Sequence, residues 1–162
     1  MSPRAALGLI LIPVVALATS MTPHTLAQRA QEADRIALVQ VLSRETVIEN
    51  GDVRRMKTIS RLAVARSFKG EGPDHVQLVQ MGGKSGLWEA RVPGDAQLEP
   101  GQTALVFLKC FQPTLCSLVA LGAGALTMVD GQLLVPDLAT NTVSKQPLAA
   151  VLTQLQLRGS TK

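Results

Sequence analysis

The sequence predicts a mainly β fold: a small barrel or sandwich of about six or seven short strands with one C-terminal amphipathic helix. Two observations support this prediction. Short stretches rich in apolar and β-branched residues alternate with turn residues along most of the chain, and apolar residues recur at helical spacing near its C-terminal end. Closure of the sheet also protects strand edges in a domain of this size.

The first 27 residues have the order of a secretory signal peptide. A positive charge at Arg4 precedes an apolar run over residues 5–18, and a small, polar stretch follows. The apolar run is too short to cross a bilayer, which takes roughly 20 residues. We expect cleavage after Ala27, with Ala18 as the alternative position. The protein is therefore expected to be exported, periplasmic or secreted, and not an integral membrane protein.

Residues 28–162 are enough for one domain with a core of its own. The formal net charge of +4 for the whole chain is only mildly basic, a property that bears on solubility more than on function. One Trp, three Phe and no Tyr leave few rings for the stacking that nucleic-acid and sugar sites use. We expect no nucleic-acid partner.

The first half of the domain is expected to contain three strands. Residues 36–42 are apolar on both faces, as in a central strand. Residues 45–49 are β-prone and precede Asn50-Gly51, a pair that favours a two-residue hairpin turn. Residues 56–68 alternate between a core face and a basic face, which predicts a long strand.

Residues 75–81 predict a shorter strand, and residues 82–101 contain seven Gly and Pro residues. We interpret this second segment as a long, partly ordered loop with a short strand near residues 87–92. Such a loop in a compact domain is often functional. Residues 103–109 form a continuous apolar stretch, which predicts the strand at the centre of the core.

The C-terminal third predicts two returns of the chain and one helix. After a turn, residues 117–121 form a returning strand, and residues 126–129 and 132–135 flank Asp130-Gly131, a second hairpin signal. A helix is expected over about residues 146–158, because Pro147 near its start and Gly159 beyond its end favour these boundaries.

Cys110 and Cys116 are the two cysteines of the chain and lie at the ends of a predicted hairpin loop. An even pair in an exported protein usually forms a disulfide. A redox-active pair is more typically Cys-x-x-Cys at the start of a helix. We interpret the pair as a structural disulfide, with free thiols or a reactive pair as the alternatives.

The order of several short motifs resembles that of small exported bacterial β-barrel domains of the OB-like, netrin/TIMP-like kind. In that group an ADxVxxGxV strand precedes a long strand ending in KG, a Gly-rich loop, a GxxxLxFL strand and a V-G-x-x-x-G turn with a closing helix. Gln40 stands where the glycine of the first strand is expected. The matching segments are residues 33–41, 63–70, 82–83, 101–108 and 119–122.

The resemblance implies an OB-like Greek-key barrel and says little about function. The best-known activity of the group is metalloprotease inhibition, in which an N-terminal cysteine chelates the catalytic zinc. This chain has no such cysteine at either expected cleavage position. That mechanism therefore does not transfer.

Two groups of residues are candidates for binding. Trp88 and Arg91 lie on the loop of residues 82–101, where an exposed Trp is suited to anchor a partner. Alternatively, Trp88 covers the mouth of the barrel.

The second group is Arg55, Lys57 and Arg61, which alternate along one strand face and could meet phosphates, uronic acids or an acidic partner. The plainer interpretation, which we favour, is a solvated face with Glu45 and Glu49 as cross-strand partners.

Nothing in the sequence indicates catalysis. His75 is the one histidine that remains after removal of residues 1–27, and no motif places a nucleophile beside it. Residues 82–86 lack the spacing of a phosphate-binding loop. We expect no metal, no cofactor and no enzyme activity, and a hydrolase without a recognisable signature is the remaining alternative.

These observations favour an exported, non-enzymatic binding or adaptor domain that engages an envelope or extracellular protein. The alternative is a structural or assembly component of the cell envelope that binds anionic polysaccharide or lipid headgroups through the basic strand face. Binding to a polyanion should weaken steeply with salt, whereas a partner held by a buried Trp should respond little.

Overall fold

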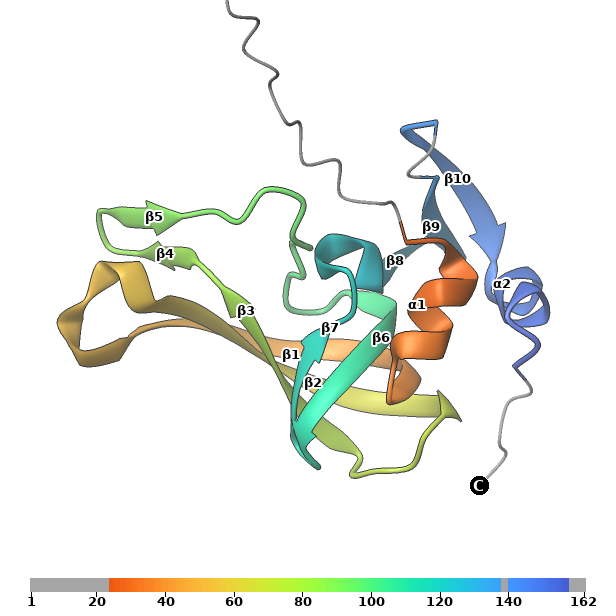
Figure 1. Cartoon of the computed structure of the whole chain (residues 1–162), viewed down its shortest axis with the longest axis horizontal. Coiled ribbons are helices and arrows are strands. Elements are labelled where there is room, and N and C mark those ends of the chain that lie inside the picture. Colours follow the sequence, from red (N-terminus) through yellow and green to blue (C-terminus); the bar gives the residue numbers. More distant parts are fainter. Residues whose placement is uncertain (1–23, 138–139, 158–162) are drawn as a thin grey trace, which may run out of the picture.

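A computed structural model of the chain describes residues 24–137 and 140–157 (Figure 1). Within these residues there are ten strands and two α-helices, and no helix is long and apolar enough to cross a membrane. In chain order the elements are α1 (Leu26–Glu32), β1 (Arg35–Ile48), β2 (Met56–Lys69), β3 (His75–Met81), β4 (Gly83–Ser85), β5 (Trp88–Ala90), β6 (Thr103–Gln112), β7 (Leu115–Leu118), β8 (Ala125–Val129), β9 (Gln132–Asp137), β10 (Thr142–Pro147) and α2 (Leu148–Gln154).

Five strands close into a barrel, which agrees with the predicted barrel or sandwich, although the described residues contain more strands than the six or seven expected. The ring runs β1–β2–β3–β7–β6 and returns to β1, because residues 35–40 of β1 also pair with residues 103–108 of β6. All pairs in the ring are antiparallel except β3–β7, which is parallel. The disulfide Cys110–Cys116 joins β6 to β7, which confirms the predicted pairing.

The sheet continues beyond the ring. One edge of β6 pairs with β8 at residues 104–106 and with β7 at residues 108–112. Strands β9 and β10 then pair in turn beyond β8, so that β8, β9 and β10 form an antiparallel extension of the sheet. Helices α1 and α2 lie on this side of the molecule, away from the β4–β5 hairpin (Figure 1).

Two apolar clusters result, one inside the barrel and one outside it. Val39 of β1 and Val106 of β6 point into the barrel, whereas Ile36 and Phe107 of the same strands point outward. The outward residues pack against the helices and the sheet extension, where Val151 of α2 is fully buried. Of the two stretches predicted to be apolar, 36–42 and 103–109, residues 36–39 and 104–108 are therefore largely buried on both faces, whereas Leu42 is 47% exposed.

A residue of the long connection completes the barrel interior. Leu98 lies outside any strand, is 1% exposed, and belongs to the inner cluster with Leu62 and Leu78. It lies among the residues that close one end of the barrel. Part of the segment that was interpreted as a loop therefore contributes to the core.

Several boundaries differ from the sequence-based expectation. Residues 45–48 continue β1 instead of forming a separate strand, because an irregular register at Leu42 lets one long strand pair with β2 along most of its length. The turn at Asn50-Gly51 has the expected positive φ, yet two short 3-10 helices make it longer than two residues. The C-terminal helix begins at Leu148, since β10 extends to Pro147.

Helix α1 begins within the segment that was expected to be removed. Thr25 caps it by accepting a hydrogen bond from the Gln28 backbone N–H at 3.2 Å, and the Gln28 side chain accepts one from the Thr25 backbone N–H at 2.8 Å. Ala27, the favoured cleavage position, is the second residue of this helix. Ala18, the alternative, lies outside the described residues.

Two residues of the resemblance motifs have structural roles. The Asp34 carboxylate accepts hydrogen bonds from the Cys110 backbone N–H at 2.9 Å and from Lys109 Nζ at 2.8 Å. Gly70, at the end of β2, has φ of +71°, and a Cβ at this position would overlap the Asp34 carbonyl oxygen. Asp34 therefore ties the start of β1 to β6, and the missing side chain of Gly70 lets the end of β2 approach Asp34 closely.

Candidate functional site

The β4–β5 hairpin presents the most exposed large apolar side chain of the described chain, Leu87, directly beside the exposed Trp88. Ser85 pairs with Trp88, so that Gly86 and Leu87 form a two-residue turn, and Gly86 has φ of +58°. Leu87 is completely exposed and Trp88 is 60% exposed. The structure therefore places Trp88 at a hairpin tip and leaves its side chain largely in solvent.

The base of this hairpin is anchored on the barrel. Gly83 lies against the hydroxyl groups of Thr46 and Thr58, and a Cβ at Gly83 would come within 2.6 Å of the Thr46 oxygen. The Thr58 hydroxyl donates to the Gly82 carbonyl at 2.8 Å, and the Lys84 backbone N–H donates to Thr46 Oγ1 at 3.3 Å. The exposed tip thus stands on a fixed base.

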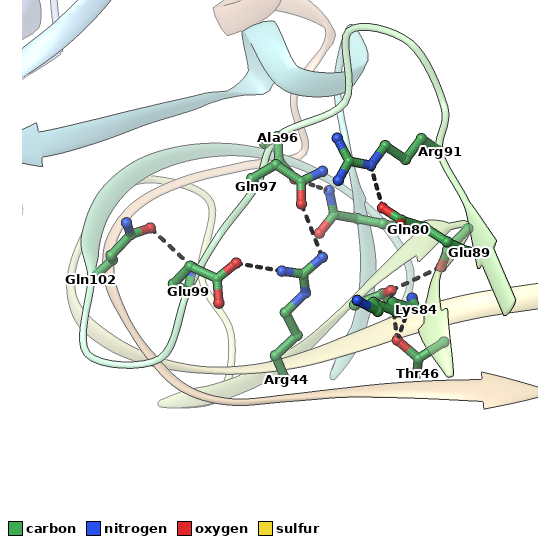
Figure 2. A network of polar contacts seen from close by, with 12 residues as sticks. Arg44, Thr46, Gln80, Lys84, Glu89, Arg91, Ala96, Gln97, Glu99 and Gln102 are labelled. Atoms are coloured by element: carbon green, nitrogen blue, oxygen red, sulfur yellow. Dashed lines mark hydrogen bonds and ion pairs between the residues drawn. The ribbon is translucent and has the colours of Figure 1, made fainter. Parts of the chain in front are cut away.

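A polar cavity of about 420 Å³ lies between the inner face of β1–β2–β3 and the segment that follows β3. Figure 2 shows the side chains around it. At this cavity the inward-facing side chains of β1, β2 and β3 are polar, whereas further along the same strands they are apolar. The polar lining consists of Arg44, Thr46, Thr58 and Gln80 from the strands, and of Lys84, Glu89, Arg91, Asp95, Gln97 and Glu99 from the covering segment.

Hydrogen bonds tie the covering segment to the strands beneath it. Arg44 of β1 donates to Glu99 at 2.5 Å and to the Gln97 side-chain oxygen at 3.1 Å (Figure 2). Gln80 of β3, which is 9% exposed, donates to Asp95 and to a backbone carbonyl, each at 2.9 Å. These contacts hold residues 95–99 over the barrel. They also give the carboxylates of Asp95 and Glu99 hydrogen-bond donors from the barrel strands.

Arg91 lies just after β5 and lines this cavity. Its guanidinium contacts the Glu89 carboxylate at 2.5 Å, and its side chain is 79% exposed. The structure thus brings Arg91 and Trp88 onto one hairpin, although the charge of Arg91 is locally balanced. Lys84 has no ion-pair partner among the described residues.

Of the three basic residues predicted to share one strand face, Lys57 and Arg61 lie on the outer face of β2, whereas Arg55 lies outside the strand. Arg55 ends a short 3-10 helix, Val53–Arg55, and is exposed before β2 begins. Lys57 pairs with Glu49 at 2.6 Å, as the plainer interpretation anticipated, and this contact lowers the pKa of the Glu49 carboxyl. Arg61 lies on the outer face of β2 between Ser43 and Gln77.

Sequence reasoning did not identify the cavity, because its lining comes from separate segments of the chain. One signal was available. Gln80 shares the inward parity of Val76 and Leu78 in the strand of residues 75–81, and a polar residue on an apolar face marks the point where a core ends.

A second, more apolar groove of about 810 Å³ lies between residues 93–97 and the 3-10 helix Leu121–Gly124. Its lining includes His24, Pro93, Ala96 and Leu121. Nothing in the sequence pattern pointed to this groove, since small residues dominate its surface.

Among the residues that the structure describes, no group of three or more His, Cys, Asp and Glu side chains is placed to hold a metal ion. Comparisons of the chain with models of protein families, with curated proteins and with solved structures find no significant match. The candidate site is therefore argued from its own geometry.

Proposed function

We propose that this protein is an exported, non-enzymatic binding or adaptor domain that engages an envelope or extracellular protein through the tip of the β4–β5 hairpin. Its barrel is proposed to be of the OB-like, netrin/TIMP-like kind. The observation that carries the proposal is the exposure of Leu87 and Trp88, 102% and 60%, on a hairpin whose base is fixed to the barrel.

Burial of this pair would supply a useful share of a binding free energy. A Trp side chain buries roughly 150–250 Å², and apolar burial contributes roughly 25 cal/mol per Å². Trp is also enriched among the residues whose truncation costs most at protein interfaces. Because the hairpin is anchored, little conformational entropy is lost when it docks.

Local charge balance favours this proposal over the alternative of a polyanion-binding envelope component. Lys57 pairs with Glu49, Arg54 with Asp52 and Arg91 with Glu89. Arg55 and Arg61, which have no ion pair among the described residues, lie on different elements. A strong attraction for anionic polysaccharide or lipid headgroups needs several unpaired cations close together.

The disulfide is compatible with export, since disulfides persist in oxidising compartments. Residues 1–23 lie outside the described part of the chain, so export is supported by the sequence pattern together with the disulfide.

Affinity capture tests the proposal. The disulfide-bonded protein is immobilised and exposed to envelope and secreted extracts of its host, beside columns with Trp88→Ala and with the Arg55/Lys57/Arg61→Glu triple substitution. Phe111→Ala is the matched control, because Phe111 is an aromatic residue with 69% exposure on a different hairpin. We expect a specific protein that is retained by the wild type and by Phe111→Ala and is lost with Trp88→Ala.

The other outcomes contradict the proposal in distinguishable ways. Retention of anionic glycan or lipid that disappears only with the triple substitution would establish the alternative. A protein retained equally by the wild type and Trp88→Ala binds at another surface. If no column retains a specific ligand, the adaptor function is wrong.

A further inference from the structure

The outer face of β1–β2–β3 is an ordered three-by-three patch of side chains. In every row, the pairing registers align one residue from each of the three strands. These residues lie outside the barrel, because the residues before and after them on each strand point inward. We call this patch the outer sheet face. Its three rows are Ser43–Arg61–Gln77, Glu45–Ile59–Val79 and Val47–Lys57–Met81.

This face combines apolar side chains with solvent exposure. Met81 is 54% exposed, and Val47, Ile59 and Val79 keep partial exposure although they belong to a sheet. Leu42, the unpaired residue at the irregular register of β1, adds a further apolar side chain that is 47% exposed. The two apolar clusters of the described chain include none of these residues.

Two charges on the face are unpaired. Glu45 and Arg61 have no ion pair among the described residues, although they lie on adjacent strands one row apart. Lys57, the third charged residue of the face, is already neutralised by Glu49. The face therefore offers one free acid and one free base beside an apolar centre, a pattern that is complementary to itself.

We propose that the outer sheet face binds the same face of a second copy of this chain, forming a two-fold symmetric dimer. Glu45 and Arg61 occupy one diagonal of a four-residue square whose other corners are Ser43 and Ile59. A two-fold axis lying between the two sheets and perpendicular to that diagonal exchanges its ends. Each Glu45 then meets Arg61 of the second copy, so the interface contains two reciprocal ion pairs, as an isologous contact requires.

The same axis passes close to Ile59, which packs against Ile59 of the second copy. The axis is oblique to the strands, so the strands of the two sheets cross at a large angle, close to the orthogonal class of sheet packing. The hairpin tip with Leu87 and Trp88 lies over the opposite, inner side of these strands. The dimer therefore leaves the proposed partner-binding tip open on both copies.

The patch is small, and this predicts a weak association. Strand spacing and rise give about 10 Å by about 14 Å between the outermost Cα atoms of the patch. Interfaces well below about 800 Å² per partner belong to transient complexes. Dimerisation is therefore expected at micromolar or higher concentrations, with exchange between monomer and dimer.

Sedimentation equilibrium of the disulfide-bonded protein tests this inference over about 5–500 μM. We expect the mean molar mass of the wild type to rise with concentration from that of one chain toward that of two. Each single charge reversal, Glu45→Arg or Arg61→Glu, places like charges opposite one another and should weaken association by about tenfold or more. The double variant Glu45→Arg/Arg61→Glu restores opposite charges and should restore dimerisation.

Circular dichroism shows whether each variant is folded, and Arg55→Glu, a charge reversal at an exposed residue outside the face, serves as the matched control. A wild type that stays monomeric at the highest concentration overturns the inference. So does a dimer that is insensitive to both single reversals, or one that the double variant fails to restore. These outcomes are independent of partner capture through Trp88, so the two proposals can fail separately.

Discussion

The carboxylate of Asp34, immediately before β1, accepts a hydrogen bond at 2.9 Å from the backbone N–H of Cys110, a disulfide cysteine of β6. The same carboxylate accepts a second hydrogen bond from Lys109 Nζ at 2.8 Å. One acidic side chain thus connects the beginning of the barrel to the end of the strand that carries its disulfide. Its protonation state should therefore affect stability.

Asp34 predicts a pH-dependent contribution to folding. The hydrogen bonds from Lys109 and Cys110 lower the pKa of Asp34 in the folded protein below its value of 3.8 in the unfolded chain. The resulting stabilisation is complete above the unfolded-state pKa and is lost as the pH falls through the lower folded-state pKa. Thermal unfolding of the wild type should lose this contribution below about pH 4.

The Asp34→Asn variant should lack this part of the pH profile. At neutral pH it should unfold at lower temperature than the wild type, and the difference should shrink as the pH falls. Glu71→Gln, a carboxylate replacement on the exposed connection between β2 and β3, should retain the wild-type profile. If the unfolding temperatures of the wild type and Asp34→Asn differed by the same amount at every pH, the ionisation of Asp34 would not be the source of this stabilisation.

Gly70→Ala should destabilise the protein strongly. Its positive φ of +71° is strained for a residue with a Cβ, and that Cβ would also overlap the backbone carbonyl of Asp34. Gly131 provides a matched control, because it has a similar φ of +75° and a Cβ there would meet no atom within 4 Å. In urea unfolding we expect Gly131→Ala to lose about 1 kcal/mol and Gly70→Ala clearly more. Equal losses would mean that the close approach to Asp34 is unimportant.

Leu98→Ala should cost about 2–5 kcal/mol of unfolding free energy, because truncation leaves a cavity in the barrel interior. Leu98 is 1% exposed, whereas Leu87, in the same long connection, is fully exposed. Leu87→Ala should therefore change the unfolding free energy by less than about 0.5 kcal/mol. Similar losses for the two variants in urea unfolding would show that Leu98 does not close the barrel.

The two cleavage positions that the sequence predicts, after Ala18 and after Ala27, should leave chains of different stability. A chain that starts at Gln28 lacks the Thr25 cap, the packing of Leu26 on the outer cluster, and the His24 carbonyl that accepts a hydrogen bond from Arg29 at 3.2 Å. Loss of an N-cap alone costs about 1 kcal/mol. We therefore expect the chain that starts at residue 19 to be more stable than the one that starts at Gln28.

Urea unfolding of the two chains measures this difference in unfolding free energy. The Thr25→Ala variant of the longer chain measures the contribution of the N-cap alone. Mass spectrometry of the processed protein shows which start is used. If both chains are equally stable, α1 contributes nothing to folding, and the position of Ala27 within this helix has no energetic significance.

The barrel could be predicted from sequence wherever the pattern reflects burial on a strand. Residues 36–39 and 104–108 are apolar at consecutive positions because each strand packs inside the barrel on one face and beneath the helices on the other. The cysteine pair was predictable because a short hairpin loop separates the two residues. Residues 45–48 were harder to assign, since their pairing partners lie beyond a turn whose length depends on two 3-10 helices.

The candidate site was less predictable, because its parts meet only through tertiary contacts. Trp88 and Arg91 were identified from composition, but the sequence pattern did not reveal that Gly83 seats their hairpin on Thr46 and Thr58. The cavity beneath depends on Arg44 reaching residues 97 and 99, more than fifty positions away. Local periodicity contains no information about such contacts.

Pairing of β1 with both β2 and β6 has a consequence for the order of folding. Residues 35–40 pair with residues of β2 about thirty positions later in the sequence, and on their other edge with residues 103–108 of β6. Closing such a long loop costs entropy before any contact stabilises it, so folding rates fall as contacting residues become more distant in sequence. One edge of β1 therefore remains unpaired during folding until residues 103–108 have joined the sheet.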